Sequence, residues 1–224
     1  MNTAHLKVAR VAAGWTQQEA AVRLGVSQPY YSQMENGTRP VPAGFALTAM
    51  RRLGLSPVSL PLPMLSQQLS PINPKYLAKA LGSLGYPGFA HLARARAAAN
   101  PAELVARALA HADLDPRLVD ALPWVLAKFA NLDWAWLVGQ CRLLNLQNRL
   151  GFLGELAVRL AAPEEARTMA LALLETSRLA LEGTLCRDSM SEPERNWVRK
   201  HRPDAAAHWN LLTTLTADQL THAA

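Results

Sequence analysis

The sequence predicts an all-α protein with two helical domains. Apolar residues recur at helical spacing along most of the 224 residues, and capping residues, glycines and prolines divide this pattern into short helices. We find no stretch in which period-two alternation is bounded by turn signals, so no sheet is expected. Half of the residues are hydrophobic and 18% are charged, which is enough apolar material to form a sizeable core.

Two short helices joined by a tight turn are predicted near the N-terminus. Thr16 and Glu19 match the Ser/Thr-x-x-Glu capping box, so the first of these helices should begin at Gln17. Gly25 should end it, because glycine adopts the left-handed conformation of a helix stop without steric cost. The second helix is expected to follow Ser27, whose hydroxyl can cap it.

A helical wheel of the second helix separates two kinds of side chain. Ser27, Tyr31 and Met34 fall on one side, which suits a core. The opposite side carries no acid and consists of Gln28, Pro29, Ser32, Gln33 and Asn36. In the major groove of DNA, glutamine can make paired hydrogen bonds to adenine, and serine can bond several bases. This outer face is therefore typical of a helix that reads DNA sequence.

At these residues the chain resembles the XRE/Cro-repressor helix-turn-helix family. The resemblance covers residues 3–55 and rests on the turn LGVSQ (24–28) and the run SQMENGTRP (32–40). It implies a double-stranded DNA operator as partner and binding as a homodimer. Pro29 departs from the family, which often has a polar residue there, so one base contact is expected to be missing or replaced by an apolar contact with a thymine methyl.

Two further side chains are expected to contact the DNA backbone. Gln17 opens a helix, and helix N-termini favour anions such as phosphate. Arg39 follows the second helix on the same side, where its charge can meet a phosphate. In the family, an arginine of the first helix pairs with a glutamate late in the second, and Arg10 and Glu35 occupy those places. We interpret this pair as a structural ion pair rather than a DNA contact.

Positive charge is denser near the N-terminus than elsewhere. The formal net charge of the chain is +6. Up to Ser56, six lysines and arginines accompany two glutamates, so this quarter of the chain carries +4. A phosphate-binding surface requires such a bias, although many solvated faces are also basic.

Prolines mark the expected domain boundary. We assign residues 1–56 to the DNA-binding domain, the proline-rich residues 57–74 to a partly packed linker, and residues 75–224 to an all-α domain for dimerisation or partner binding. Helices are predicted at 3–13, 17–24, 28–36, 43–53, 74–84, 87–99, 101–112, from 116 with a break at Pro123, 134–144, 147–161, 163–183, 192–202 and 203–212, with a short turn after Thr216.

Motifs for catalysis or metal binding are missing from the sequence. Histidines and cysteines do not stand at metal-ligand spacing, and no glycine-rich phosphate loop, nucleophile elbow or paired-carboxylate motif occurs. We therefore expect no enzymatic activity, no metal and no cofactor. Cys141 and Cys186 are far apart, and neither a signal sequence nor a run of membrane-spanning length is found. A reduced, cytoplasmic protein without a membrane partner is the expectation.

Two segments of the C-terminal part are distinctive. One holds Trp134 and Trp136, followed by the polar residues 147–149, that is Gln147, Asn148 and Arg149. These polar residues either satisfy helix ends at an inter-helix junction or form a docking surface for another protein. The segment faintly resembles antitoxins paired with nucleotidyltransferase-like toxins, which also place an arginine-leucine-glycine run on a helix. The other segment is a basic cluster beside Trp197, formed by Arg195, Arg199, Lys200 and Arg202. It either touches DNA or an acidic partner or is a solvated helix face with the tryptophan buried, and we favour the second interpretation.

Three functions are compatible with these features. The favoured one is a sequence-specific transcriptional repressor, leaning towards an antitoxin that binds a partner toxin and represses its own operon. The alternative is a ligand-sensing repressor with a small-molecule pocket in its helical domain. An enzyme fused to a DNA-binding domain is the third, and it would need a cluster of titratable residues in a cleft.

Overall fold

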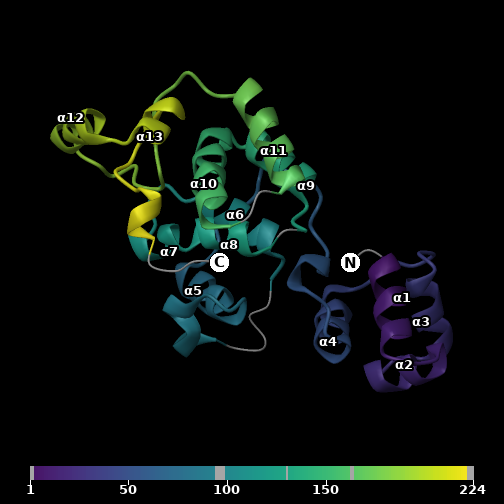
Figure 1. Cartoon of the computed structure of the whole chain (residues 1–224). Helices are drawn as coiled ribbons and strands as arrows, with labels where there is room; N and C mark the ends of the chain where they lie inside the picture. The colour runs from purple at the N-terminus through teal and green to yellow at the C-terminus, as the bar shows by residue number, and fades with distance from the viewer. Residues whose placement is uncertain (1–2, 94–98, 130, 162–163, 221–224) are drawn as a thin grey trace. The chain divides into compact units, whose positions relative to one another are not determined.

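The computed structural model describes residues 3–93, 99–129, 131–161 and 164–220, and within them it is mostly helical (Figure 1). The described residues divide into two compact units. The N-terminal unit runs to Pro63 and includes Asn100, and the C-terminal unit contains Met64 and nearly all that follows. The division falls inside the proline-rich segment 57–74, and each unit is a body with its own core.

The N-terminal unit is a small helical bundle. Its elements are α1 (Thr3–Ala12), α2 (Gln17–Leu24), α3 (Gln28–Glu35), α4 (Ala43–Leu53) and the short 3-10 helix η1 (Pro57–Ser59). Leu6, Tyr31 and Met34 have no exposed surface and form the centre of the core with small residues of α2 and α4. Trp15 packs against the edge of this core, as expected for a residue just before a helix cap.

Local signals set the ends of α2 and α3. The backbone N–H of Thr16 donates to Glu19 Oε2 at 2.7 Å, and the N–H of Glu19 donates to Thr16 Oγ1 at 3.2 Å, which completes the capping box. Gly25 ends α2 with a φ of 75°. Ser27 precedes α3 in extended conformation without a side-chain cap bond, and it is exposed. The prediction that Ser27 faces the core was wrong. The helical wheel assumes helical spacing, and Ser27 precedes Gln28, the first residue of α3.

The proline-rich segment is packed rather than free. Leu60 is buried against Ala46 and Met50 of α4, so the first part of the segment belongs to the N-terminal unit. In the C-terminal unit, the side-chain amide of Gln140 exchanges two hydrogen bonds with the backbone of Ser66. Apolar and polar contacts thus fix both parts of the segment.

The C-terminal unit is a cluster of short helices around α10, which lies at its interior (Figure 1). Its helices are α5 (Pro74–Ser83), η2 (Pro87–Leu92), α6 (Pro101–Leu109), α7 (Pro116–Asp120), α8 (Leu122–Lys128), α9 (Trp134–Leu143), α10 (Gln147–Leu160), α11 (Glu165–Thr176), α12 (Glu192–His201), α13 (Asp204–His208) and η4 (Ala217–Gln219). Helix α10 packs against α8, α9 and α11. Leu126, Leu137 and Phe152 from three of these helices are fully buried.

A two-stranded parallel sheet was not expected. Strand β1 (Gly183–Thr184) pairs with β2 (Leu211–Leu212). Two residues are too few to show the alternation that marks a strand in a sequence. The helix predicted at 203–212 therefore ends at His208, and the last two residues of that range form β2.

Several predicted helices differ in their ends. The helix predicted at 163–183 is α11, Glu165–Thr176, and residue 163 of that range lies outside the described residues. The one predicted at 87–99 is a 3-10 helix that ends at Leu92, and residues 94–98 of that range lie outside the described residues. Helix η2 lies against the backbone of α5 at Gly82, where an added Cβ would be only 2.2 Å from the Phe89 carbonyl oxygen. The break predicted at Pro123 lies instead at Ala121, between α7 and α8. Pro123 does not interrupt α8, because a proline is tolerated in the first turn of a helix.

Candidate DNA-binding interface

Helix α3 turns one face into the N-terminal unit and the other face to solvent. Tyr31 and Met34 are fully buried, and burial raises the pKa of the Tyr31 hydroxyl to about 12. The outer face contains the five residues of the wheel: Pro29, Gln33 and Asn36 are exposed, and Gln28 and Ser32 are half-buried. The outer face thus presents amides and a hydroxyl, and it contains no acid.

A chain of polar contacts runs from the interior of the unit to this face. Arg10 Nε donates to Glu35 Oε1 at 2.9 Å, and the Glu35 side chain is only 1% exposed. Gln17 Nε2 donates to the other carboxylate oxygen of Glu35 at 2.7 Å. Gln28 Nε2 in turn donates to Gln17 Oε1 at 3.3 Å. Arg10 also donates to the carbonyl of Trp15 at 2.7 Å, so its guanidinium faces inward as a structural ion pair requires.

This chain limits what the two glutamines can do at a surface. Gln17 gives one amide hydrogen to Glu35 and accepts a hydrogen bond from Gln28, so its second amide hydrogen and the first-turn backbone N–H groups of α2 remain to hold an anion. Gln28 gives one amide hydrogen to Gln17 and keeps its carbonyl oxygen and second amide hydrogen for other partners. The buried carboxylate therefore fixes the orientation of both side chains before any ligand arrives.

Arg39 lies next to the outer face of α3. Its guanidinium stands 4.4 Å from the centre of the Tyr30 ring, and its backbone N–H donates to the carbonyl of Gln33 at 3.2 Å. Thr38 Oγ1 donates to the same carbonyl at 3.1 Å, so the segment after α3 folds back on the helix end. Arg39 is exposed, and its guanidinium is held over the Tyr30 ring by packing.

Comparisons with known proteins agree with this geometry. Residues 3–62 match the family of helix-turn-helix domains, and they form an XRE-like helix-turn-helix domain. A stretch of 57 residues is 44% identical to the propionyl-CoA carboxylase regulator of Cereibacter sphaeroides, an alignment that covers 25% of this chain and 12% of that regulator. No solved structure matches the chain.

The helix-turn-helix domain extends beyond residue 56. Its match ends at residue 62, and the N-terminal unit ends at Pro63. The reason is physical, because the buried Leu60 completes a small apolar cluster with α4. Asn100 also belongs to this unit, where its side-chain amide donates to the carbonyls of Val58 and Leu60 at 3.1 and 2.7 Å.

Outside the helix-turn-helix domain, residues 147–149 do not form an exposed surface. Gln147 and Asn148 are about 5% and 4% exposed. Gln147 Nε2 donates to the carbonyl of Ser177, and Asn148 exchanges two hydrogen bonds with the backbone of Leu179. The inter-helix junction is the interpretation that fits, since these amides hold the chain where it leaves α11.

Arg149 joins three segments of the C-terminal unit. Its guanidinium donates to the carbonyls of Leu109, His111 and Thr184 at 2.7 to 2.8 Å. It also lies 3.1 Å from Asp188 Oδ1 in an ion pair, and its side chain is 13% exposed. These bonds satisfy backbone carbonyls at the end of α6 and in β1, which is a structural role.

The tryptophans divide into buried and exposed residues. Trp134 is 5% exposed, whereas Trp136, two residues further along α9, is half-buried. Trp209 packs on α10, where a Cβ on Gly151 would lie 2.3 Å from its ring, and its Nε1 donates to Glu155 at 3.0 Å. Trp197 is 56% exposed and stacks on His201, which corrects the expectation that it is buried.

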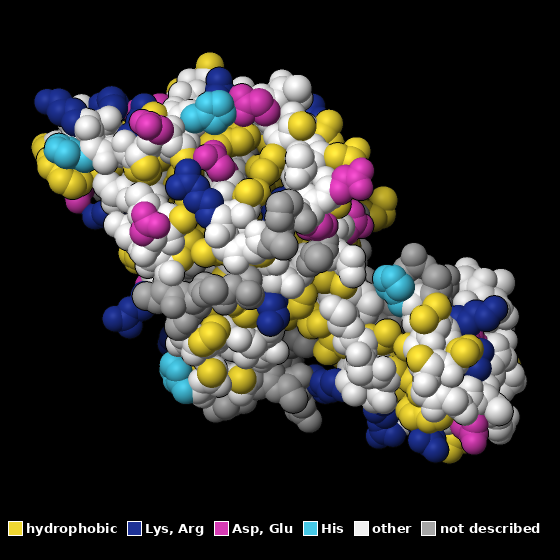
Figure 2. All heavy atoms as spheres, viewed as in Figure 1, with side chains coloured by type: hydrophobic (Ala, Val, Ile, Leu, Met, Phe, Trp, Pro, Cys, Tyr) yellow, Lys and Arg dark blue, Asp and Glu magenta, His cyan; other side chains and the backbone are white. Residues whose placement is uncertain are grey.

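Helix α12, which carries Trp197, is basic. Lys and Arg side chains gather over it (Figure 2). Arg199 and Arg202 share the carboxylate of Glu182, whose pKa the hydrogen bonds from Arg199 hold below its usual value. Hydrogen bonds within the unit also hold Arg195, which donates to two backbone carbonyls. Much of this charge is therefore engaged within the C-terminal unit.

Neither a metal-ligand cluster nor a membrane-spanning helix is found among the residues that the structure describes. Among them, no group of three or more His, Cys, Asp or Glu side chains is arranged to hold a metal ion. No helix in the described ranges has the length and apolar character that crossing a bilayer requires. Cys141 and Cys186 are unpaired and buried, and burial raises the pKa of their thiols to about 12 and about 11.

Proposed function

We propose that the protein is a DNA-binding transcriptional regulator whose helix α3 enters the major groove. The observation that carries this proposal is the outer face of α3, which is polar, free of acids and held in place by the buried Glu35. Gln33 has both ends of its amide available for a base edge, and Gln28 keeps part of its amide available. Arg39 and the N-terminus of α2 are the proposed phosphate contacts.

The regulator acts as a homodimer in this proposal. One helix-turn-helix covers half of an operator, and two copies related by a twofold axis read half-sites roughly 34 Å apart. We place the dimer contact in the C-terminal unit, since the helix-turn-helix domain must keep α3 accessible. An operator read in this way is an inverted repeat.

Selection of binding sites tests this function directly. The purified full-length protein is incubated with a library of random double-stranded DNA, and the bound fraction is amplified and sequenced over several rounds. The proposal expects an enriched inverted repeat, and light scattering of the protein on that site should give two chains per DNA. Recovery of DNA without any shared sequence would refute sequence-specific regulation.

We further propose that this regulator is an antitoxin, which binds a toxin through its C-terminal unit and represses their shared operon. Support comes from the size of that unit and from its exposed tryptophans. Trp197 exposes 56% of its surface and Trp136 is half-buried, and exposed tryptophans are enriched at the centres of interfaces. The buried Gln147 and Asn148 are not part of this proposed surface.

Co-expression with the neighbouring genes tests the antitoxin proposal. One neighbour should arrest growth when expressed alone, and the full-length protein should rescue growth and co-purify with it. Trp197→Ala should weaken this complex by about 2 kcal/mol or more while leaving operator binding unchanged. Trp134→Ala is the matched core variant, and it should lower thermal stability instead. If no neighbouring product is toxic or binds the protein, the antitoxin role is wrong while DNA binding stands.

A further inference from the structure

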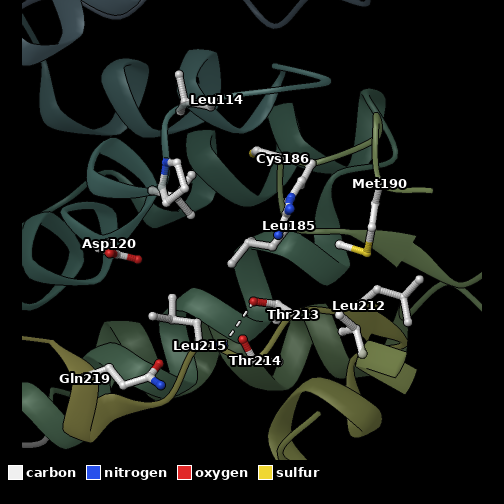
Figure 3. A pocket seen from close by; sticks show the side chains of 14 residues that line it. Leu114, Asp120, Leu185, Cys186, Met190, Leu212, Thr213, Thr214, Leu215 and Gln219 are labelled. Atoms are coloured by element: carbon white, nitrogen blue, oxygen red, sulfur yellow. Dashed lines mark hydrogen bonds between the residues drawn. The ribbon is translucent and has the colours of Figure 1, made fainter. Parts of the chain in front are cut away.

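A hollow of about 340 Å³ lies within the C-terminal unit, between α7, the segment after β1, α12 and the segment after β2 (Figure 3). Its volume falls within the range of small-molecule sites. Most of its wall is apolar and includes Leu114, Val119, Leu185 and Met190, all of them buried. A wall of this kind takes up the body of a small organic molecule and displaces water from it.

One carboxylate stands at the margin of this hollow without a partner. Asp120 is half-buried at the last residue of α7, and Figure 3 shows its side chain at the edge of the space. Within the described ranges its carboxylate makes neither a hydrogen bond nor an ion pair. Burial, followed by the charge of Asp115, raises the pKa of Asp120. The C-terminal end of a helix is also an unfavourable place for negative charge.

The other polar groups of the hollow are mostly neutral. Thr213 and Thr214 place their hydroxyls along its lower margin in Figure 3, and Thr213 Oγ1 accepts a hydrogen bond from the N–H of Leu215 at 3.2 Å. Arg187 also lines the space, but Glu194 lies 3.0 Å from its guanidinium and balances its charge. The unbalanced charge among the residues that line the hollow is therefore the negative charge of Asp120.

We propose that this hollow binds a small organic cation, with its ammonium group beside Asp120 and its apolar body against Leu114, Val119 and Leu185. The ammonium supplies the counter-charge that the carboxylate lacks. Displacement of water from the apolar wall adds the nonpolar part of the affinity. All the residues that line this site belong to the C-terminal unit.

Three probes of nearly equal shape and different charge test the proposal. Phenethylamine is a cation at pH 7, 2-phenylethanol is neutral and phenylacetate is an anion. Isothermal titration calorimetry of each against the full-length protein should show that phenethylamine binds at least tenfold more tightly than the other two. Equal affinity for all three would overturn the role of Asp120, and tighter binding of phenylacetate would assign recognition to Arg187 instead.

Three variants locate the binding site. Asp120→Asn keeps the shape of the side chain, and it should reduce the affinity for phenethylamine at least tenfold. Asp218→Asn removes the same charge from an exposed position that does not line the hollow, and it should leave the affinity unchanged. Thr214→Phe fills the space from an exposed position and should abolish binding. Undetectable binding of phenethylamine to the wild-type protein, or full binding to Asp120→Asn, would refute the proposal. Neither result bears on DNA recognition.

Discussion

Replacing Glu35 by alanine should destabilise the helix-turn-helix domain severely. The substitution removes an almost fully buried carboxylate and leaves the guanidinium of Arg10 and the amide of Gln17 without their partner. Breaking one side of such a pair costs about 3–5 kcal/mol. A domain of this size has a total stability of roughly 3–9 kcal/mol at ~0.05–0.15 kcal/mol per residue. The change therefore consumes between a third and all of the stability.

Native-state hydrogen exchange followed by mass spectrometry measures this loss in the full-length protein. The method separates the two units, whereas a global melting curve would combine them. Exchange protection in peptides from α2 and α3 should fall by roughly 100-fold or more, since each factor of ten corresponds to about 1.4 kcal/mol. Peptides from α10 should not change, because they belong to the C-terminal unit.

Two further variants decide whether the ion pair is the cause. Gln33→Ala changes an exposed side chain of the same helix and should leave protection in α2 and α3 intact. The double variant Arg10→Met, Glu35→Leu removes both charges together and should regain most of the stability that Glu35→Ala loses. If Glu35→Ala lowers protection less than threefold, the pair contributes little and the reasoning is wrong.

Three other predictions concern single side chains. Arg39→Ala should weaken binding to every DNA sequence and reduce the slope of log affinity against log salt by about one unit, and an unchanged slope in anisotropy titrations would remove Arg39 from the interface. Arg149→Met should destabilise the C-terminal unit by about 3 kcal/mol in hydrogen exchange, because several carbonyls and Asp188 lose a buried charged donor; a loss below ~1 kcal/mol would contradict this. Cys141 and Cys186, whose pKa values burial raises to about 12 and about 11, should react with a thiol reagent at pH 8 far more slowly in native than in denatured protein, and equal rates would show that they are accessible.

Elements with local signals were predicted well. Thr16 and Glu19 form the expected capping box, and the sequence near Ser191 and Glu194 forms another at the start of α12. The all-α class was correct apart from the two-residue strands, and Gly25 ends α2 as its conformational freedom suggested. Each of these features is decided by residues within three or four positions of one another.

Apart from the Arg10–Glu35 pair, which the family resemblance supplied, features that depend on distant residues were not predicted. The helix expected to run to residue 183 ends at Thr176, where Gln147 and Asn148 bind backbone groups some thirty residues away in sequence. The same contacts bury those amides, and no local pattern distinguishes a junction from a docking surface. The hollow beside Asp120 is lined by segments as far apart in the sequence as residues 114 and 219. The local sequence around Asp120 therefore does not indicate that a hollow lies beside it.

The central claim is that α3 reads DNA bases, and the affinity of Gln33→Ala for DNA tests it most directly. Fluorescence anisotropy at one fixed salt concentration compares the selected operator with a scrambled duplex of equal length. We expect the variant to lose roughly 1–3 kcal/mol of binding free energy on the operator and almost nothing on the scrambled duplex. Equal losses on both duplexes, or no loss on either, would contradict the claim that this face of α3 recognises sequence.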